Sequence, residues 1–154
     1  MRLTRLTDFA VRVLIHLALN PGRLCTIAEI ADRYRISQAH LMKVTHQLAR
    51  AGWITTLRGN GGGMALALAP DEIRLGQVVV SMEPDLEVVE CFSTGSTCML
   101  TGSCKLTGVM HDALRSFVDR LDQTTLADVL PAPATGPADK VVRLHRPAAA
   151  RKRA

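Results

Sequence analysis

The sequence predicts a mostly α-helical protein: a winged helix-turn-helix domain with a small β-hairpin wing, followed by a long dimerisation helix. Two short helical segments separated by a tight turn precede a glycine-rich hairpin, which is the order of a winged helix-turn-helix. A long segment with a single apolar stripe lies near the end of the chain. Between these parts, three of the four cysteines fall within residues 91–104.

The first helix is expected over residues 8–19. Thr7 is a suitable N-cap, and a negative charge at Asp8 stabilises the first turn. The polar residues of the segment are Asp8, Arg12 and His16, at i, i+4 and i+8. One narrow polar stripe predicts that most of this helix is buried. On the residues alone, Asp8 is a helix-start charge that pairs with Arg12.

A helix-turn-helix pair is expected next. Thr26, with Glu29 three residues later, forms a capping box for a short helix over 27–34. Ser37 caps a third helix over about 38–51. Its apolar residues recur at spacings of three and four, so they face inward and leave polar residues on the outer face.

A β-hairpin wing is expected over residues 54–68. Residues 54–57 and 64–68 suit strands, and the glycine-rich segment 59–63 forms the tip between them. Such a segment can also cradle a nucleotide phosphate, but this one lacks the P-loop pattern and does not open a helix. A short helix follows over 75–82.

The cysteine segment carries Cys91, Cys98 and Cys104, separated by six and five residues. Structural zinc sites normally have cysteines about two to four residues apart, whereas iron–sulfur ligands are more variably spaced. Acidic residues precede the segment and disfavour free thiolates, so low-pKa redox cysteines are not expected. An iron–sulfur cluster is favoured over zinc or incidental thiols, with the cluster type undecided.

Three cysteines leave one position of such a cluster for another ligand. The candidates are Cys25, His111, Asp8 or a small molecule. Cys25 is expected to be a small buried residue, and His111 a solvated neighbour of Asp112. The residues alone do not choose among these candidates.

The long helix is expected to start after Cys104, with Ser103 as its N-cap. A lone helix with one apolar stripe needs a partner surface. A second copy of the chain is the favoured partner, giving a homodimer, because helix-turn-helix proteins usually bind DNA as dimers. The alternative is that the stripe packs on its own domain. The expected dimerisation residues are Leu106, Met110, Leu114, Phe117 and Leu121.

Charge is unevenly distributed along the chain. Residues 1–69 carry nine Lys/Arg and three Asp/Glu, residues 70–130 carry four and ten, and residues 131–154 carry six and one. The basic first part favours a polyanionic partner. The Pro-, Ala- and Arg-rich end is expected to be a disordered tail. With no recognisable signal peptide or membrane-length apolar run, we expect a cytoplasmic protein without a membrane partner.

Three motifs, LTDFAVR, RGNGGG and the cysteine segment running into CKLTGVMHDAL, resemble the Rrf-type winged-helix transcription regulators over about residues 1–130. Thr107 stands where the family's cluster-assembly regulators have a histidine, and Asp8 where they lack an acid. The resemblance is therefore strongest to the family's nitric-oxide-sensing repressors, with its iron-responsive regulators as an alternative. It implies one iron–sulfur cluster per subunit, [4Fe–4S] being preferred to [2Fe–2S]. The implied ligands are Cys91, Cys98, Cys104 and Asp8 of the partner subunit.

The function implied by this resemblance is that of a homodimeric repressor on palindromic double-stranded operator DNA. Nitric oxide reacts with the cluster, the link through Asp8 is lost, and the helix-turn-helix pairs leave the register of the two half-sites. The helix after Ser37 is expected in the major groove, and the wing in the minor groove or on the backbone. The expected DNA contacts are Arg2, Arg5, Thr26, Ser37, Gln38, His40, Lys43, Arg58, Gly59 and Asn60.

Two other classes of protein remain as alternatives. A redox enzyme would need a substrate pocket or a second redox centre, for which no motif is present, so we do not expect an enzyme. A zinc-stabilised winged-helix DNA-binding protein would need no gas chemistry. The expected organisation is a DNA-binding domain over 1–82, a cluster-binding loop over 83–104, a dimerisation helix and final turn over 105–130, and the tail over 131–154.

Overall fold

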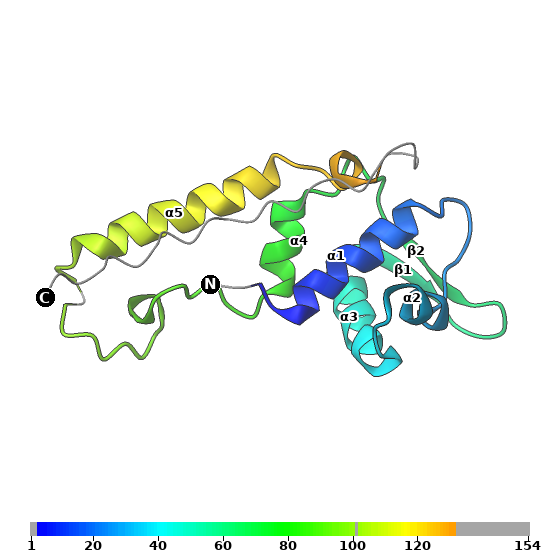
Figure 1. Cartoon of the computed structure of the whole chain (residues 1–154), viewed down its shortest axis with the longest axis horizontal. Coiled ribbons are helices and arrows are strands. Elements are labelled where there is room, and N and C mark those ends of the chain that lie inside the picture. The colour runs from blue at the N-terminus through cyan, green and yellow to red at the C-terminus, as the bar shows by residue number, and fades with distance from the viewer. Residues whose placement is uncertain (1–2, 101, 132–154) are drawn as a thin grey trace, which may run out of the picture.

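The structure, a computed structural model, describes residues 3–100 and 102–131. It confirms the predicted fold class, because helices dominate and the strands form one small antiparallel sheet (Figure 1). Arg2 and the predicted tail, apart from Pro131, lie outside the described residues. The elements are α1 (Arg5–Ala18), α2 (Ile27–Tyr34), α3 (Gln38–Arg50), β1 (Ile54–Leu57), β2 (Gly63–Leu66), α4 (Leu75–Met82) and α5 (Lys105–Asp122), with short 3-10 turns at Glu90–Phe92 and Ala127–Val129.

Residues 3–82, which we call the body, fold around one apolar core. Helix α1 lies against both α3 and α4, and the hairpin follows α3 directly. The predicted inner face of α3 is confirmed, since Leu41, Val44 and Leu48 are all completely buried. Trp53 Nε1 donates a hydrogen bond of 2.9 Å to Ser81 Oγ and so links the start of the hairpin to α4.

Helix α1 starts earlier than the sequence predicted. Thr4, not Thr7, is the N-cap: its side chain accepts the Thr7 backbone N–H at 3.3 Å, while Thr7 itself is completely buried. The Thr4 backbone N–H donates to Glu83 Oε1 at 2.8 Å. This contact, between residues far apart in the chain, favours the earlier start. The caps predicted for α2 and α3, Thr26 and Ser37, are confirmed.

The predicted wing is an antiparallel hairpin in which Ile54 pairs with Leu66 and Leu57 with Gly63. A Cβ added at Gly62 would lie 2.3 Å from the Leu57 carbonyl oxygen, so only glycine fits this turn. In Figure 1 the hairpin tip projects at the same end of the molecule as α2, away from α5.

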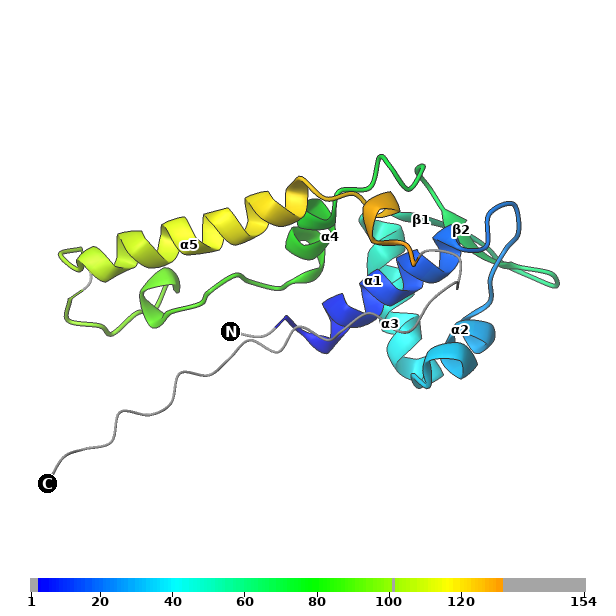
Figure 2. The ribbon, with the colours of Figure 1, turned by 45° about the horizontal axis from the view of Figure 1, so that its top comes forward.

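Residues 83–122, which we call the arm, extend away from the body as a loop followed by α5. Both views show the loop running beside α5 to that helix's first turn (Figures 1 and 2). Cys104 occupies the N-cap position of α5, so the predicted Ser103 cap was wrong. At the other end of α5, a Cβ added at Gly76 would lie 2.7 Å from the Asp122 backbone nitrogen, which shows how closely α4 and α5 pack.

The chain returns to the body after α5. Leu126 is completely buried, and its backbone N–H donates to the Ile73 carbonyl at 2.8 Å. The arm is therefore attached to the body at both of its sequence ends, and the first turn of α5, which follows Cys104, lies at its far tip (Figure 2). Among the described residues, no helix combines the length and hydropathy that crossing a membrane requires.

Candidate DNA-binding face and cysteine pocket

The first turn of α3 presents the predicted base-reading residues. Ser37 Oγ accepts the His40 backbone N–H at 3.3 Å and shares a second hydrogen bond of 2.9 Å with His40 Nδ1. Ser37, Gln38, His40 and Lys43 are all exposed. The His40 ring lies 6.2 Å from the Phe9 ring, so the first turn of α3 contacts α1. Polar side chains are thus held at the start of an exposed helix, as major-groove reading requires.

The wing and the remaining predicted contacts are also at the surface. Arg58, Gly59 and Asn60 are exposed at the hairpin tip, and Arg5 is exposed in the first turn of α1. Thr26 is exposed, but its hydroxyl oxygen already accepts the Glu29 backbone N–H at 3.2 Å. Figures 1 and 2 place the hairpin and the α2–α3 pair at one end of the molecule, opposite the tip of the arm.

The cysteine pocket lies at the tip of the arm. Cys91, Cys98 and Cys104 all line this one pocket of about 220 Å³, between the loop and the first two turns of α5. The rest of its lining is mostly apolar and includes Leu106 and Met110. The structure therefore brings together the three thiols that the sequence singled out. Three sulfur donors around a small apolar pocket are a donor set that fits an iron–sulfur cluster.

Cys104 differs from the sequence-based expectation. The backbone N–H groups of Thr107 and then Leu106, at the start of α5, lower the pKa of the Cys104 thiol. The expected effect of the acidic neighbours, which disfavour a free thiolate, is therefore opposed at Cys104 by the start of α5. The position of Cys104 directly before a predicted helix could have indicated this lowered pKa from the sequence.

Hydrogen bonds within the loop hold the cysteines near one another. Glu90 Oε1 accepts the Thr97 backbone N–H at 3.0 Å and its hydroxyl at 2.8 Å, which lowers the pKa of Glu90. This contact spans the stretch between Cys91 and Cys98. The Thr107 hydroxyl lies 3.5 Å from the Cys91 sulfur and so links the loop to α5.

The candidate fourth ligands are not brought to this pocket within one chain. Asp8 is half-exposed on α1 and forms an ion pair of 2.9 Å with Arg12, as the residues alone predicted. It is not among the residues that line the cysteine pocket. Cys25 is completely buried in the body, as predicted, and His111 is exposed with its Nδ1 3.9 Å from Asp112.

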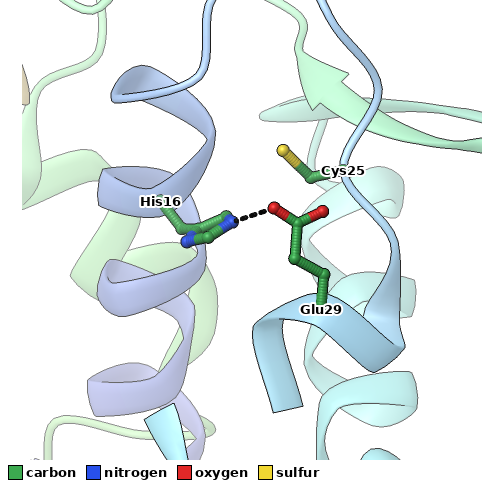
Figure 3. A group of neighbouring side chains, drawn as sticks. All are labelled: His16, Cys25 and Glu29. Atoms are coloured by element: carbon green, nitrogen blue, oxygen red, sulfur yellow. Dashed lines mark hydrogen bonds and ion pairs between the residues drawn. The ribbon is translucent and has the colours of Figure 1, made fainter. Parts of the chain in front are cut away.

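The sequence did not anticipate one further cluster of side chains. His16, Cys25 and Glu29 place an imidazole nitrogen, a sulfur and a carboxylate oxygen within 4.8 Å of one another (Figure 3). His16 was expected on a polar stripe with Asp8 and Arg12, but its side chain is buried. The three residues come from different elements, so no local sequence pattern predicts their proximity.

Comparison with known proteins assigns the family. The Rrf2 family, described as "Iron-dependent Transcriptional regulator", matches residues 3–132. The chain belongs to the Rrf2 family. The resemblance derived from the sequence motifs is thereby confirmed, and the family description indicates a metal or iron–sulfur cofactor.

Curated relatives narrow the position within the Rrf2 family. The HTH-type transcriptional regulator NsrR of Shouchella clausii is 46% identical over 132 residues, which cover 84% of this chain and 89% of the relative. NsrR of Bacillus subtilis is 42% identical over 132 residues, covering 84% and 90%. These identities support an NsrR-type Rrf2 regulator. The relatives are transcriptional regulators and not enzymes, so this Rrf2 protein is a DNA-binding transcriptional regulator, as predicted.

Solved Rrf2-type structures confirm the fold. IscR of T. potens superimposes with a TM-score of 0.67 at 25% identity, covering 83% of this chain and 85% of that one. The oxidised form of Staphylococcus aureus CymR gives a TM-score of 0.70 at 22% identity, covering 88% and 100%, and this match concerns the fold alone.

Proposed function

We propose that this Rrf2 protein is a homodimeric repressor that uses an iron–sulfur cluster, of the [4Fe–4S] type, to sense nitric oxide and release operator DNA. The observation that carries the proposal is the convergence of Cys91, Cys98 and Cys104 on one pocket. The relatives named NsrR, at 42% to 46% identity, support the same function. The proposed ligands are these three cysteines and Asp8 of the partner subunit.

The proposed cluster site suits its ligands chemically. The start of α5 lowers the pKa of the Cys104 thiol, and the thiolate is the form that ligates iron. When bound, an iron–sulfur cluster supplies iron that reacts with nitric oxide. Within its own chain, Asp8 is held by an exposed ion pair with Arg12. Exposed i,i+4 pairs stabilise a protein by only about 0.3–0.5 kcal/mol, so this pair would not prevent Asp8 from binding a cluster.

The signal has a physical route from the arm to the DNA-binding face. Glu83, the first residue of the arm, accepts the backbone N–H of the α1 N-cap, Thr4. Asp8 lies one turn farther along the same helix. The ring of Phe9, the next residue, lies beside that of His40 in the first turn of α3. Both the loop and Asp8 therefore act on the turn of α1 that supports the base-reading helix.

The division of labour follows from this arrangement. Residues 1–82 would read a palindromic operator, with α3 in the major groove and the wing in the minor groove or on the backbone. Residues 83–104 would hold the cluster, and residues 105–130 would join two copies. The exposed side chains of Leu106 (59%) and Val109 (62%) support a second copy as the partner of α5.

The proposed function is tested on the full-length protein purified without air. We expect an iron–sulfur absorption band that bleaches when a nitric oxide donor is added, together with loss of operator binding in a mobility-shift assay. Cys98→Ser should lose both the colour and the response, whereas Thr94→Ser, an exposed residue of the same loop, should keep them. A colourless zinc-containing protein would overturn the cluster proposal.

The family description, iron-dependent, supports a second candidate function, that of a regulator responding to iron or cluster status. The same assay separates the two candidates. A coloured protein that binds the operator in the presence of nitric oxide, and releases it when iron is chelated, would replace nitric oxide by iron status as the signal.

A further inference from the structure

We propose that His16, Cys25 and Glu29 form a second metal site that takes Zn²⁺, separate from the cysteine pocket. Figure 3 shows the three side chains converging from α1, from the segment before α2, and from the first turn of α2. Imidazole nitrogen, thiolate and carboxylate oxygen are the three ligand types that Zn²⁺ prefers. The proposal stands whether or not the arm binds an iron–sulfur cluster.

The distances suit a tetrahedral ion. His16 Nε2 lies 3.2 Å from Glu29 Oε1. Two such ligands at ordinary zinc distances on a tetrahedron are about 3.3 Å apart. The Cys25 sulfur lies within 4.8 Å of both ligand atoms, against about 3.6 Å in a closed tetrahedral site. A small side-chain movement would therefore complete three protein ligands, leaving the fourth position to water.

The surroundings orient the ligands and balance the charge. Tyr34 packs edge-on against the His16 imidazole, with ring centres 5.6 Å apart, and limits its rotation. A neutral imidazole, a thiolate and a carboxylate together neutralise Zn²⁺, which suits a buried position. On binding, the Cys25 thiol releases its proton to solvent, and the His16 proton resides on Nδ1.

Arg23 would compete with a metal ion for the Glu29 carboxylate. Its guanidinium donates to both carboxylate oxygens of Glu29, at 3.0 Å for the Nη1–Oε2 pair. It is 47% exposed and can swing into solvent. Arg23 therefore discriminates between two explanations of the cluster. In a purely structural ion-pair network, removing Arg23 only weakens the fold, whereas in a metal site it removes a positive charge that opposes the ion.

A metal ion here would join three parts of the body. Cys25 pairs through its backbone with Met64 of β2, with N–O distances of 2.9 and 2.8 Å. His16 lies in α1, and Glu29 opens the helix-turn-helix pair. An ion bound by all three would fix α1, α2 and the wing relative to one another, so its expected role is to stabilise the DNA-binding geometry.

The test uses the full-length chain with Cys91, Cys98 and Cys104 changed to serine, which removes the competing thiols. We expect Co²⁺, the probe, to bind at one ion per chain with a thiolate-to-cobalt charge-transfer band, and Zn²⁺ to displace it. Glu29→Gln should weaken Co²⁺ binding at least about tenfold. Arg23→Ala should tighten it about tenfold. Cys25→Ser should abolish the charge-transfer band.

The control is His46→Gln, an exposed histidine of α3, which should leave the titration unchanged. Absence of the charge-transfer band, or its persistence after Cys25→Ser, overturns the site. Weaker binding after Arg23→Ala also overturns it. If Cys25→Ser does not fold, Glu29→Gln still tests the site. Glu29 is partly exposed, so this substitution should not prevent folding. In the wild-type chain with its iron bound, Zn²⁺ should raise Tm, and Glu29→Gln should remove that increase.

Discussion

The body and the arm of this molecule are stabilised in different ways. Nearly all of the core side chains belong to residues 3–82, whereas none of the described residues between 83 and 122 is buried. The body can therefore fold on its own apolar core. The arm gains little stability from its own burial, so the proposed dimer partner and the proposed cluster would stabilise it.

The difference also appears at the helix starts. Helices α1, α2 and α3 each begin with a Thr or Ser side chain that accepts a backbone N–H. Within the described chain, α4 and α5 begin without a side-chain cap. At α5 the N-cap position is occupied by Cys104, whose thiol pKa is lowered by backbone N–H groups of the first turn. A proposed cluster ligand thus stands where α1, α2 and α3 have a capping residue.

The largest expected effect comes from truncating the core of the body. Leu41→Ala should lower the free energy of unfolding by about 2–5 kcal/mol, because Leu41 is completely buried and leaves a cavity. Chemical denaturation followed by circular dichroism measures the change. The neighbouring Met42→Ala is the matched control, since Met42 is 61% exposed and should change stability by no more than about 0.5 kcal/mol. Equal effects would contradict the assigned inner face of α3.

The next largest effect should appear in the arm as a loss of association. Val109→Glu should weaken the dimer at least about tenfold, or about 1.4 kcal/mol, because it places a charge on the proposed interface. Sedimentation velocity measures the dissociation constant. Gly108→Glu is the control, since an added Cβ there meets nothing within 4 Å and Gly108 lies on the side of α5 opposite the predicted apolar stripe that includes Leu106 and Met110. A wild-type chain that sediments as a monomer would refute the dimer proposal.

Cap removal sharpens the contrast between the two regions. Ser37→Ala should cost about 1 kcal/mol of unfolding free energy, since α3 loses its N-cap. Ser103→Ala should change it by less than about 0.5 kcal/mol, because Cys104 occupies the cap position of α5. Urea denaturation of both variants provides the comparison. A larger loss for Ser103→Ala would restore Ser103 as the functional cap.

The smallest expected effect is a pH dependence localised to the body. Hydrogen bonds from Arg23, and then from His16, lower the pKa of Glu29 from 4.5 to about 2. A lowered carboxyl pKa contributes stability above pH 4.5 that is lost as the pH falls toward 2. Glu29→Gln should therefore flatten the dependence of the unfolding midpoint on pH in this window. Glu87→Gln, an exposed arm residue without an ion pair among the described residues, is the control.

Local elements of the body could be predicted because local chemistry determines them. Thr26 and Ser37 precede amphipathic segments, and the glycines of 59–63 fall between two strand-forming runs, so the helices and the hairpin were expected in place. The sequence alone could not show which of two nearby residues caps a helix. Thr4 and Thr7 both satisfy the capping rule, and the contact with Glu83, remote in sequence, favours Thr4.

The two candidate sites also differ in how far the sequence predicts them. The cysteine pocket was predictable because its three thiols lie close together in the sequence. The His16, Cys25 and Glu29 cluster was not, because its members come from three elements whose packing is known only from the structure. The proposed ligand role of Asp8 involves a second copy of the chain, so neither the sequence pattern nor the fold of one chain tests it.

Helix α5 packs on α4 at its last turn, so a small rotation there moves its first turn a long way. At 1.5 Å per residue, its 18 residues span about 27 Å between the Asp122 contact with α4 and the cysteine pocket. A rotation of about 10° about the Asp122 contact moves the first turn of α5 by about 5 Å over such a length. Conversely, a modest force applied to Cys104 exerts a large torque on α4. A small change at the proposed cluster would therefore be enough to rotate α4, against which α1 packs.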